Sequence, residues 1–182
     1  QYFAMARGLQ QNELDIPAME MTKWFDTNYH YLVPEIKKSQ VFRMASSKVV
    51  DEFREAKNMG IFTRPVLLGP VSYLFLSKSA SPGFDPIQAL PYLLPVYQQI
   101  LQKLADEGAD WVQIDEPCLV KDLDETAQAA YRTAYHKLSE VTGIRLMLTT
   151  YFGGLGENRS LAVHLPTAGL HLDLVRAPDQ MK

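Results

Sequence analysis

The chain has 182 residues, of which 47% are hydrophobic and 21% charged, which is typical of one globular domain with a core of its own. Its formal charge is −3 at pH 7, and its densest basic run is the pair Lys37 and Lys38. This argues against a nucleic-acid partner, because such binding depends on clustered Lys and Arg. No apolar run approaches the roughly 18–20 residues that cross a bilayer, and the first residues lack a secretory signal.

The only cysteine is Cys118, which excludes an internal disulfide and fits a reducing compartment. We therefore expect the protein to be cytoplasmic. The chain starts at Gln1 and stops shortly after an expected strand, so we also expect it to be a piece of a longer protein.

Residues 20–35 combine polar and aromatic side chains more densely than a purely structural strand does. We predict a ligand-facing surface here. The ammonium group of Lys23 is suited to a carboxylate or phosphate, and the neighbouring rings offer a flat apolar surface; the alternative is a solvated lysine. The amide of Asn28 is suited to reading a ligand edge, and the alternative is that it bridges two backbone groups.

From residue 65 onward, short β-rich apolar runs alternate with longer runs of helical periodicity. This alternation is typical of βα units on a parallel sheet. Strands are expected at residues 65–70, 111–116, 145–152 and 169–175, and helices at residues 48–59, 89–107 and 124–141. Ser, Pro and Gly dominate residues 77–86, which predicts a mobile loop.

The predicted fold class is α/β, and more specifically a (β/α)8 TIM barrel. The strands expected after residue 65 are fewer than the eight of a closed barrel. If residues 22–32 add one more, the chain holds an incomplete barrel of about five βα units. Either the other strands lie outside this sequence or the sheet is open.

Polar residues follow the ends of three expected strands. Asp115 and Glu116 end one, Thr149 lies at the end of the next, and Asp173 and Arg176 lie near the end of the last. In barrels of parallel strands the working residues gather at the carboxyl ends, so we expect these groups to converge on one mouth.

Asp115 and Glu116 are adjacent on a strand, so their side chains point to opposite sides and cannot share a proton. One interpretation is a carboxylate that orients a substrate amine or a basic side chain. The other is an ion pair that locks neighbouring strands, with Arg145, Arg176 or Lys121 as the partner.

The residues show no metal-binding pattern. The four histidines are spread along the sequence, and no His-x-x-x-His, Cys-x-x-Cys or His-x-Cys spacing occurs. Cys118 follows a proline in an apolar context, which favours a buried, inert thiol over a nucleophile. We predict no catalytic residue and no metal ligand in this chain.

Several motifs together resemble the amino-terminal half of the cobalamin-independent methionine synthase family. The matching segments occur in the family's order and are MTKWFDTNYHY at residues 21–31, VPE at 33–35, PVLLGP at 65–70, LPVY at 94–97, QIDEP at 113–117 and LTTYF at 148–152. In the family's carboxy-terminal barrel the strand that corresponds to residues 148–152 carries a His-x-Cys pair that binds zinc. That pair is absent here, which places the resemblance in the amino-terminal barrel.

The resemblance implies one of two facing (β/α)8 barrels, with residues 1–182 as part of the first. The implied reaction transfers a methyl group from 5-methyltetrahydropteroyltriglutamate to homocysteine, without cobalamin and with zinc held by ligands outside this chain. The amino-terminal barrel is implied to bind the folate polyglutamate tail, and Lys23 and Asn28 match that role. This chain alone is expected to be inactive.

Two alternatives stay open. One is a non-catalytic barrel that serves as a scaffold or binding domain, and the other is a barrel like that of uroporphyrinogen decarboxylase. We also expect the cut edges of an incomplete barrel to promote self-association or partial disorder.

Overall fold

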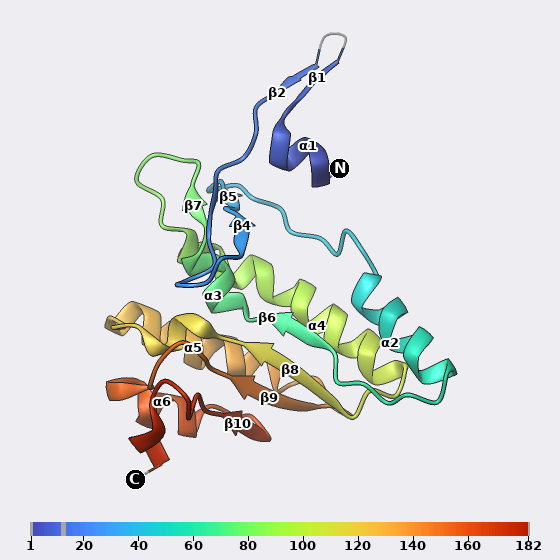
Figure 1. Ribbon diagram of the computed structural model, residues 1–182, viewed down its shortest axis with the longest axis vertical. Helices are drawn as coiled ribbons and strands as arrows, with labels where there is room; N and C mark the ends of the chain where they lie inside the picture. The colour runs from blue at the N-terminus through green and yellow to red at the C-terminus, as the bar shows by residue number, and fades with distance from the viewer. Residues whose placement is uncertain (1, 12–13, 182) are drawn as a thin grey trace.

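A computed structural model describes residues 2–11 and 14–181 of the chain. At its centre is a sheet of four parallel strands in the order β10-β9-β8-β6 (Figure 1). These strands are β6 (Val66–Leu68), β8 (Trp111–Asp115), β9 (Arg145–Thr149) and β10 (Gly169–His171). Every strand predicted after residue 65 is therefore confirmed, as is the α/β class, although β10 is shorter than predicted.

The three predicted helices are also confirmed, with ends within three residues of the prediction. They are α2 (Lys48–Asn58), α4 (Leu90–Asp106) and α5 (Glu125–Leu138). Asp124 is the N-cap of α5, and its carboxylate accepts a hydrogen bond of 2.8 Å from the backbone N–H of Ala127. This contact satisfies one of the free N–H groups at the helix start.

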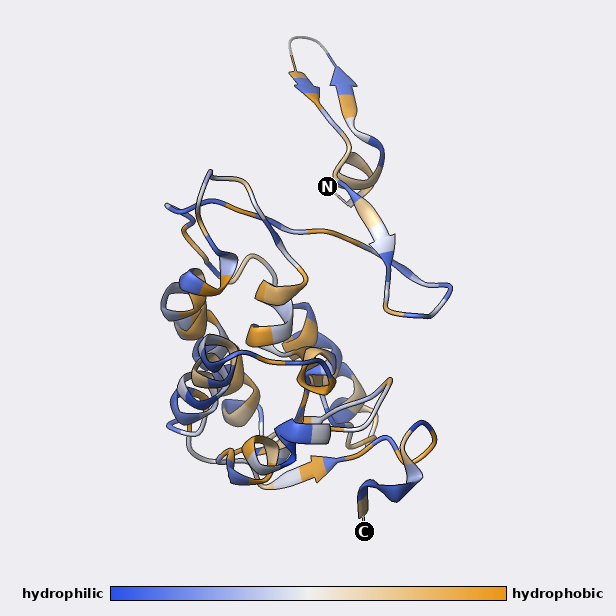
Figure 2. Ribbon diagram, turned by 90° about the vertical axis from the view of Figure 1, so that its left-hand side faces the viewer, coloured by the Kyte–Doolittle hydropathy of each residue, from blue (hydrophilic) through white to orange (hydrophobic). Residues whose placement is uncertain are grey.

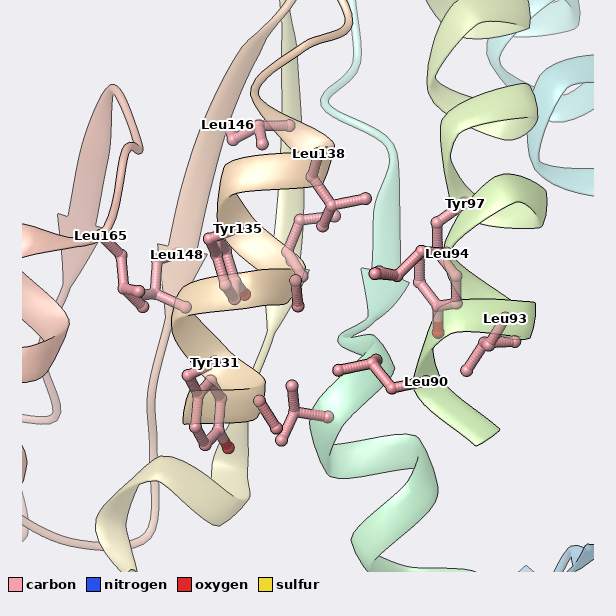
Figure 3. Close-up of a cluster of buried hydrophobic side chains, with 14 of the residues drawn as sticks. Leu90, Leu93, Leu94, Tyr97, Tyr131, Tyr135, Leu138, Leu146, Leu148 and Leu165 are labelled. Carbon is pink, nitrogen blue, oxygen red and sulfur yellow. The ribbon is translucent and has the colours of Figure 1, made fainter. Parts of the chain in front are cut away.

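The core lies between one face of the sheet and the helices α4 and α5. Val112 and Ile114 are fully buried on that face, and leucines and tyrosines of both helices pack with β9 (Figure 3). The residues that alternate with them, Gln113, Asp115 and Met147, are only partly buried. The sheet is thus covered by helices on one face and is not closed among the described residues.

The prediction that residues 22–32 form a further strand of this sheet is wrong. They belong to an antiparallel hairpin of β3 (Met21–Lys23) and β4 (His30–Leu32), in which Lys23 pairs with His30. The turn between the strands is closed by a hydrogen bond of 2.7 Å from the N–H of Trp24 to the carbonyl of Tyr29. The central sheet therefore has four described strands rather than five.

The amino-terminal residues form an arm that extends away from the sheet in both views (Figures 1 and 2). It consists of α1 (Tyr2–Arg7) and the antiparallel strands β1 (Leu9–Gln11) and β2 (Leu14–Ile16). Further along, β5 (Glu35–Ile36) pairs in parallel with β7 (Lys78–Ser79). The stretch at residues 77–86, predicted to be a loop, therefore contains a short strand.

Two six-residue helices, α3 (Pro70–Phe75) and α6 (Arg159–His164), are too short to show a helical period in the sequence. The remaining elements are short 3-10 helices, η1 (Pro86–Ala89), η2 (Pro117–Val120), η3 (Gly156–Asn158) and η4 (Pro178–Met181). Within residues 2–11 and 14–181, no helix combines the length and apolarity needed to cross a membrane.

Candidate functional site

The carboxyl ends of the central strands meet at one edge of the sheet, as predicted. Asp115 is paired with Thr149, and Thr149 with His171, so these three residues form a row across neighbouring strands. In parallel strands, paired residues share a face. The row lies on the face that α4 and α5 leave open, where Asp115 is partly buried, Thr149 is buried and His171 is exposed.

Asp115 occupies the centre of a hydrogen-bonded chain on the open face. Its carboxylate accepts bonds of 2.7 Å from the amide of Gln113 and 3.2 Å from the hydroxyl of Tyr151. Arg64 in turn donates to Gln113 over 2.8 Å. Partial burial raises the pKa of Asp115, although both hydrogen bonds act in the opposite direction. Neutral donors thus hold this carboxylate.

Glu116 points to the other side of the strand, as predicted, and it is fully buried. Its carboxylate accepts hydrogen bonds from the backbone N–H groups of Ser72 at 2.8 Å and Val71 at 3.3 Å, at the start of α3. The hydroxyl of Tyr135 lies 3.4 Å away. Burial raises the pKa of Glu116 to about 7, against the lowering effect of these donors. Its environment makes it a structural anchor for α3.

The predicted ion pair between Asp115 or Glu116 and a basic neighbour is wrong for the described residues. Arg145 pairs with Asp110, and Arg176 pairs with Asp26. The ammonium of Lys121 lies 5.2 Å from the centre of the Phe25 ring, in a cation–π contact. Backbone amides and neutral side chains bind the two carboxylates instead.

Lys23 and Asn28 both lie on the β3–β4 hairpin, and both are exposed. Lys23 is the last residue of β3, and Asn28 lies in the turn before β4. In that turn the hydroxyl of Thr27 donates to the carbonyl of Trp24 at 2.7 Å and accepts from the N–H of Tyr29 at 3.1 Å. The hairpin thus presents both predicted ligand-binding side chains to solvent from one ordered turn.

A chain of aromatic rings connects the hairpin to the carboxyl edge of the sheet. The ring centres of Tyr31 and Trp24 are 5.5 Å apart, those of Trp24 and Phe25 are 5.2 Å apart, and those of Phe25 and Phe152 are 5.1 Å apart. Phe152 then contacts Tyr151 at 4.7 Å, and Tyr151 donates to Asp115. The Phe25–Phe152 pair is tilted and the other three pairs are edge-to-face; such ring pairs stabilise a contact beyond its buried area.

Phe25 and Phe152 share an unusual backbone conformation. Their φ angles are 53° and 72°, in the left-handed region that bulky residues rarely adopt. Each such residue costs about 1–3 kcal/mol and persists only where its surroundings hold it. The two strained residues face each other at the point where the hairpin meets the sheet.

No metal centre is assigned to this chain. Among residues 2–11 and 14–181, no three His, Cys, Asp or Glu side chains come together in a way that could hold an ion. Cys118 is buried with a free thiol, and burial raises its pKa to about 11. The resemblance implies that the zinc ligands lie outside this chain.

Sequence reasoning placed Asp115 and Asp173 at strand ends, but it missed the hairpin that carries Lys23 and Asn28 and the contacts that hold it. Phe25, Asp26 and Phe152 carry no signal as single residues, because their roles depend on segments far apart in the sequence. Asp173 is the one local signal, because aspartate side chains in turns often accept hydrogen bonds from backbone N–H groups two or three residues further on.

Comparison with known proteins shows which sequences this chain resembles. Residues 1–182 match the family described as "Cobalamin-independent synthase, N-terminal domain". Curated relatives carry the name 5-methyltetrahydropteroyltriglutamate–homocysteine methyltransferase. One from Chelativorans sp. (strain BNC1) is 60% identical over 190 residues, covering 100% of this chain and 25% of the relative.

Other relatives of the same name give a similar picture. One from Nitrobacter winogradskyi is 54% identical over 197 residues, covering 100% of this chain and 26% of its own length. One from Xylella fastidiosa (strain M23) is 56% identical over 180 residues, covering 99% of this chain and 24% of its own length. The chain thus spans about a quarter of the length of the curated relatives it matches.

Proposed function

The chain belongs to the cobalamin-independent synthase family, as its amino-terminal domain, and from this premise we propose that it is the folate-tail-binding part of a methyltransferase. The reaction is the transfer of a methyl group from 5-methyltetrahydropteroyltriglutamate to homocysteine, which forms methionine. Lys23 and Asn28 bind the polyglutamate tail, and this chain alone is inactive. The protein works in a reducing, cytoplasmic compartment, where Cys118 stays a free thiol.

The observation that carries the proposal is the position of Lys23 and Asn28 on one ordered hairpin. Both are exposed, and the hairpin sits against the carboxyl edge of a parallel sheet. That edge is where ligands of such sheets bind. A polyglutamate tail carries several carboxylates, which suit the ammonium of Lys23 and the amide N–H groups of Asn28. The ring of Tyr29, 79% exposed beside Asn28, offers an apolar surface.

The proposal includes a (β/α)8 barrel for the longer protein. The helices cover one face of the four-stranded sheet, and the other face carries Gln113 and Asp115. β6 and β10 lie at the ends of the strand order, so each has one free edge among the described strands. Further strands that pair with these edges would close the sheet around its polar face. Self-association of the isolated chain through the same edges stays a prediction.

Zinc and homocysteine belong to other parts of the longer protein in this proposal. The described residues bring no metal-ligand set together, so no step of the reaction is assigned to this chain. Its part is to bind and orient the folate substrate, which lowers the entropic cost of bringing two substrates together.

One alternative has an observation in its favour. Asp115 and Glu116 are held by neutral partners inside the fold, as they would be in a non-catalytic scaffold that keeps the sheet and binds no folate. Nothing in the site favours a barrel like that of uroporphyrinogen decarboxylase.

Calorimetric titration of the chain with methyltetrahydrofolate triglutamate separates the two functions. We expect binding that needs no zinc, weakens as salt rises and falls about threefold to tenfold in Lys23→Ala, because one exposed charge contact is lost. Lys103→Ala, which removes an exposed lysine from α4, is the matched control and should bind normally. An absence of binding, or equal affinity of the Lys23 and Lys103 variants, would support the scaffold.

A further inference from the structure

The hairpin that carries Lys23 and Asn28 touches the sheet through a small set of side chains. The turn at residues 24–29 meets the segments that follow β9 and β10. The Phe25 ring contacts Phe152. The next residue, Asp26, forms an ion pair of 2.6 Å with Arg176. Two adjacent residues of the turn are thus held by two different loops.

Asp173 connects these two loops. One oxygen of its carboxylate accepts a hydrogen bond of 2.8 Å from the backbone N–H of Phe152. The other oxygen accepts from the N–H groups of Val175 at 3.0 Å and Arg176 at 2.9 Å. A single side chain therefore fixes the backbone of two residues that contact the turn, Phe152 and Arg176, and these hydrogen bonds hold the pKa of Asp173 below its usual range.

Two contacts of the turn with the sheet, those of Phe152 and Arg176, depend on this arrangement. Phe152 has a φ of 72°, a conformation that a phenylalanine keeps only when neighbours hold it. The Arg176 and Asp26 side chains are about half exposed, at 51% and 53%. An ion pair so exposed is weak unless its geometry is fixed in advance. The carboxylate of Asp173 supplies the fixed geometry for both contacts.

We propose that Asp173 is a positioning residue for the ligand-binding hairpin: by holding Phe152 and Arg176, it seats the turn at residues 24–29 on the sheet and so pre-arranges Lys23 and Asn28. The inference rests on the proposed function for its ligand, although the seating of the hairpin does not require one. A hairpin that is seated only part of the time binds its ligand with an affinity reduced by that fraction.

The seating is measured without ligand, by acrylamide quenching of Trp24 fluorescence in a Trp111→Phe background, where Trp24 is the only tryptophan. Trp24 is partly buried and its ring packs on Phe25, which in turn contacts Phe152, so release of the turn from the sheet alters the surroundings of Trp24. We expect Asp173→Asn to raise the quenching constant about twofold or more. Asp106→Asn, which changes an exposed aspartate on α4, should leave it unchanged. Unchanged quenching in Asp173→Asn would overturn the proposal.

A double-variant test shows whether Asp173 acts through the hairpin contacts. Asp173→Asn and Asp26→Asn each release the turn in this proposal. The quenching constant of the double variant should therefore be no larger than that of the stronger single variant. If the two single effects on the quenching constant add in the double variant, Asp173 acts through other contacts and the proposal is overturned. Exchange of the charges, Asp26→Arg with Arg176→Asp, should restore seating that either change alone removes; a failure of this exchange to restore any seating would also count against the proposal. Arg176→Gln replaces Asp173→Asn if the latter does not fold.

Triglutamate affinity then separates this inference from the proposed function. We expect Asp173→Asn to weaken binding about tenfold, as for a hairpin seated a tenth of the time. If the unchanged protein does not bind triglutamate, the proposed function fails, while the quenching results still decide the positioning role. If triglutamate binds and Asp173→Asn alters quenching but not affinity, Asp173 positions the hairpin without serving the ligand, and the inference is overturned in that part.

Discussion

The helix-backed sheet and the amino-terminal region, residues 2–47, are held together in different ways. The sheet and helices α4 and α5 share an extensive apolar core, whereas the described residues up to 47 include only two buried hydrophobic side chains, Val33 and Ile36. The hairpin in that region is held by ring contacts, exposed ion pairs and single hydrogen bonds. The proposed ligand-binding residues thus lie on the weakly held region, and the strongly held region serves as their support.

The largest effect is expected where the support is least tolerant of change. Gly69 lies against the buried carboxylate of Glu116, and a methyl group added to it would overlap that carboxylate. Gly69→Ala must push Glu116 away from its backbone partners in α3, so we expect a loss of about 3–5 kcal/mol in the free energy of unfolding. Denaturant unfolding measures it.

The matched control is Gly153→Ala. A methyl group there meets only Val120, at an ordinary contact distance of 3.5 Å, so its effect should stay below about 1 kcal/mol. Equal losses in the two variants would show that the support tolerates a methyl group at Gly69 and would contradict the role given to Glu116.

The next largest effect is a pH dependence of stability, and it arises in the helix-backed sheet. The pKa of Glu116 is raised from its ordinary value of 4.5 to about 7 by burial. Between these values the folded chain holds a proton that the unfolded chain has released. The contribution of Glu116 to stability is therefore full below about pH 4.5, decreases as the pH rises to about 7, and is level above that, with a total loss of about 3 kcal/mol.

Urea unfolding at a series of pH values tests this expectation, with Glu116→Gln as the variant that cannot titrate. Its stability should lack the decrease between pH 4.5 and 7. Glu125→Gln, in the first turn of α5, removes a carboxylate from the same region and should keep the decrease. If Glu116→Gln shows the same pH profile as the unchanged protein, another group is responsible.

The same division explains what the sequence could predict. The strands after residue 65 and the helices α2, α4 and α5 follow from apolar periodicity and from end signals such as Asp124, because burial against a core imposes those patterns. The hairpin could not be predicted in this way. Its turn places Phe25 at positive φ without the usual glycine, and side-chain hydrogen bonds of Thr27 close it.

The candidate site divides in the same way. Asp115 was placed correctly because strand ends in a parallel sheet have a known position. The contacts of Phe25 with Phe152 and of Asp26 with Arg176 join distant segments, and no local pattern marks them. The ion pairs expected for Asp115 and Glu116 were wrong because polar neighbours and backbone N–H groups already occupy those carboxylates.

The smallest expected effect on overall stability lies in the weakly held region. Lys78 on β7 forms ion pairs of 3.0 Å with Glu20 and 3.2 Å with Glu35. It thus connects β7 to the residues that flank the hairpin on both sides. Its side chain is 43% exposed. Lys78→Met should therefore lower the free energy of unfolding by less than about 1 kcal/mol. Hydrogen exchange at the N–H of Val33, which bonds to the carbonyl of Glu20 at 2.8 Å, should become several-fold faster.

Lys137→Met is the control, because it removes an equally exposed ion pair, of 2.8 Å with Glu140, from the support. It should change neither overall stability nor exchange at Val33 by much. If Lys78→Met instead lowers the free energy of unfolding by several kcal/mol, the hairpin segment and the sheet unfold as one unit. The hairpin would then be as firmly held as its support, and local release would not control the exposure of Lys23 and Asn28.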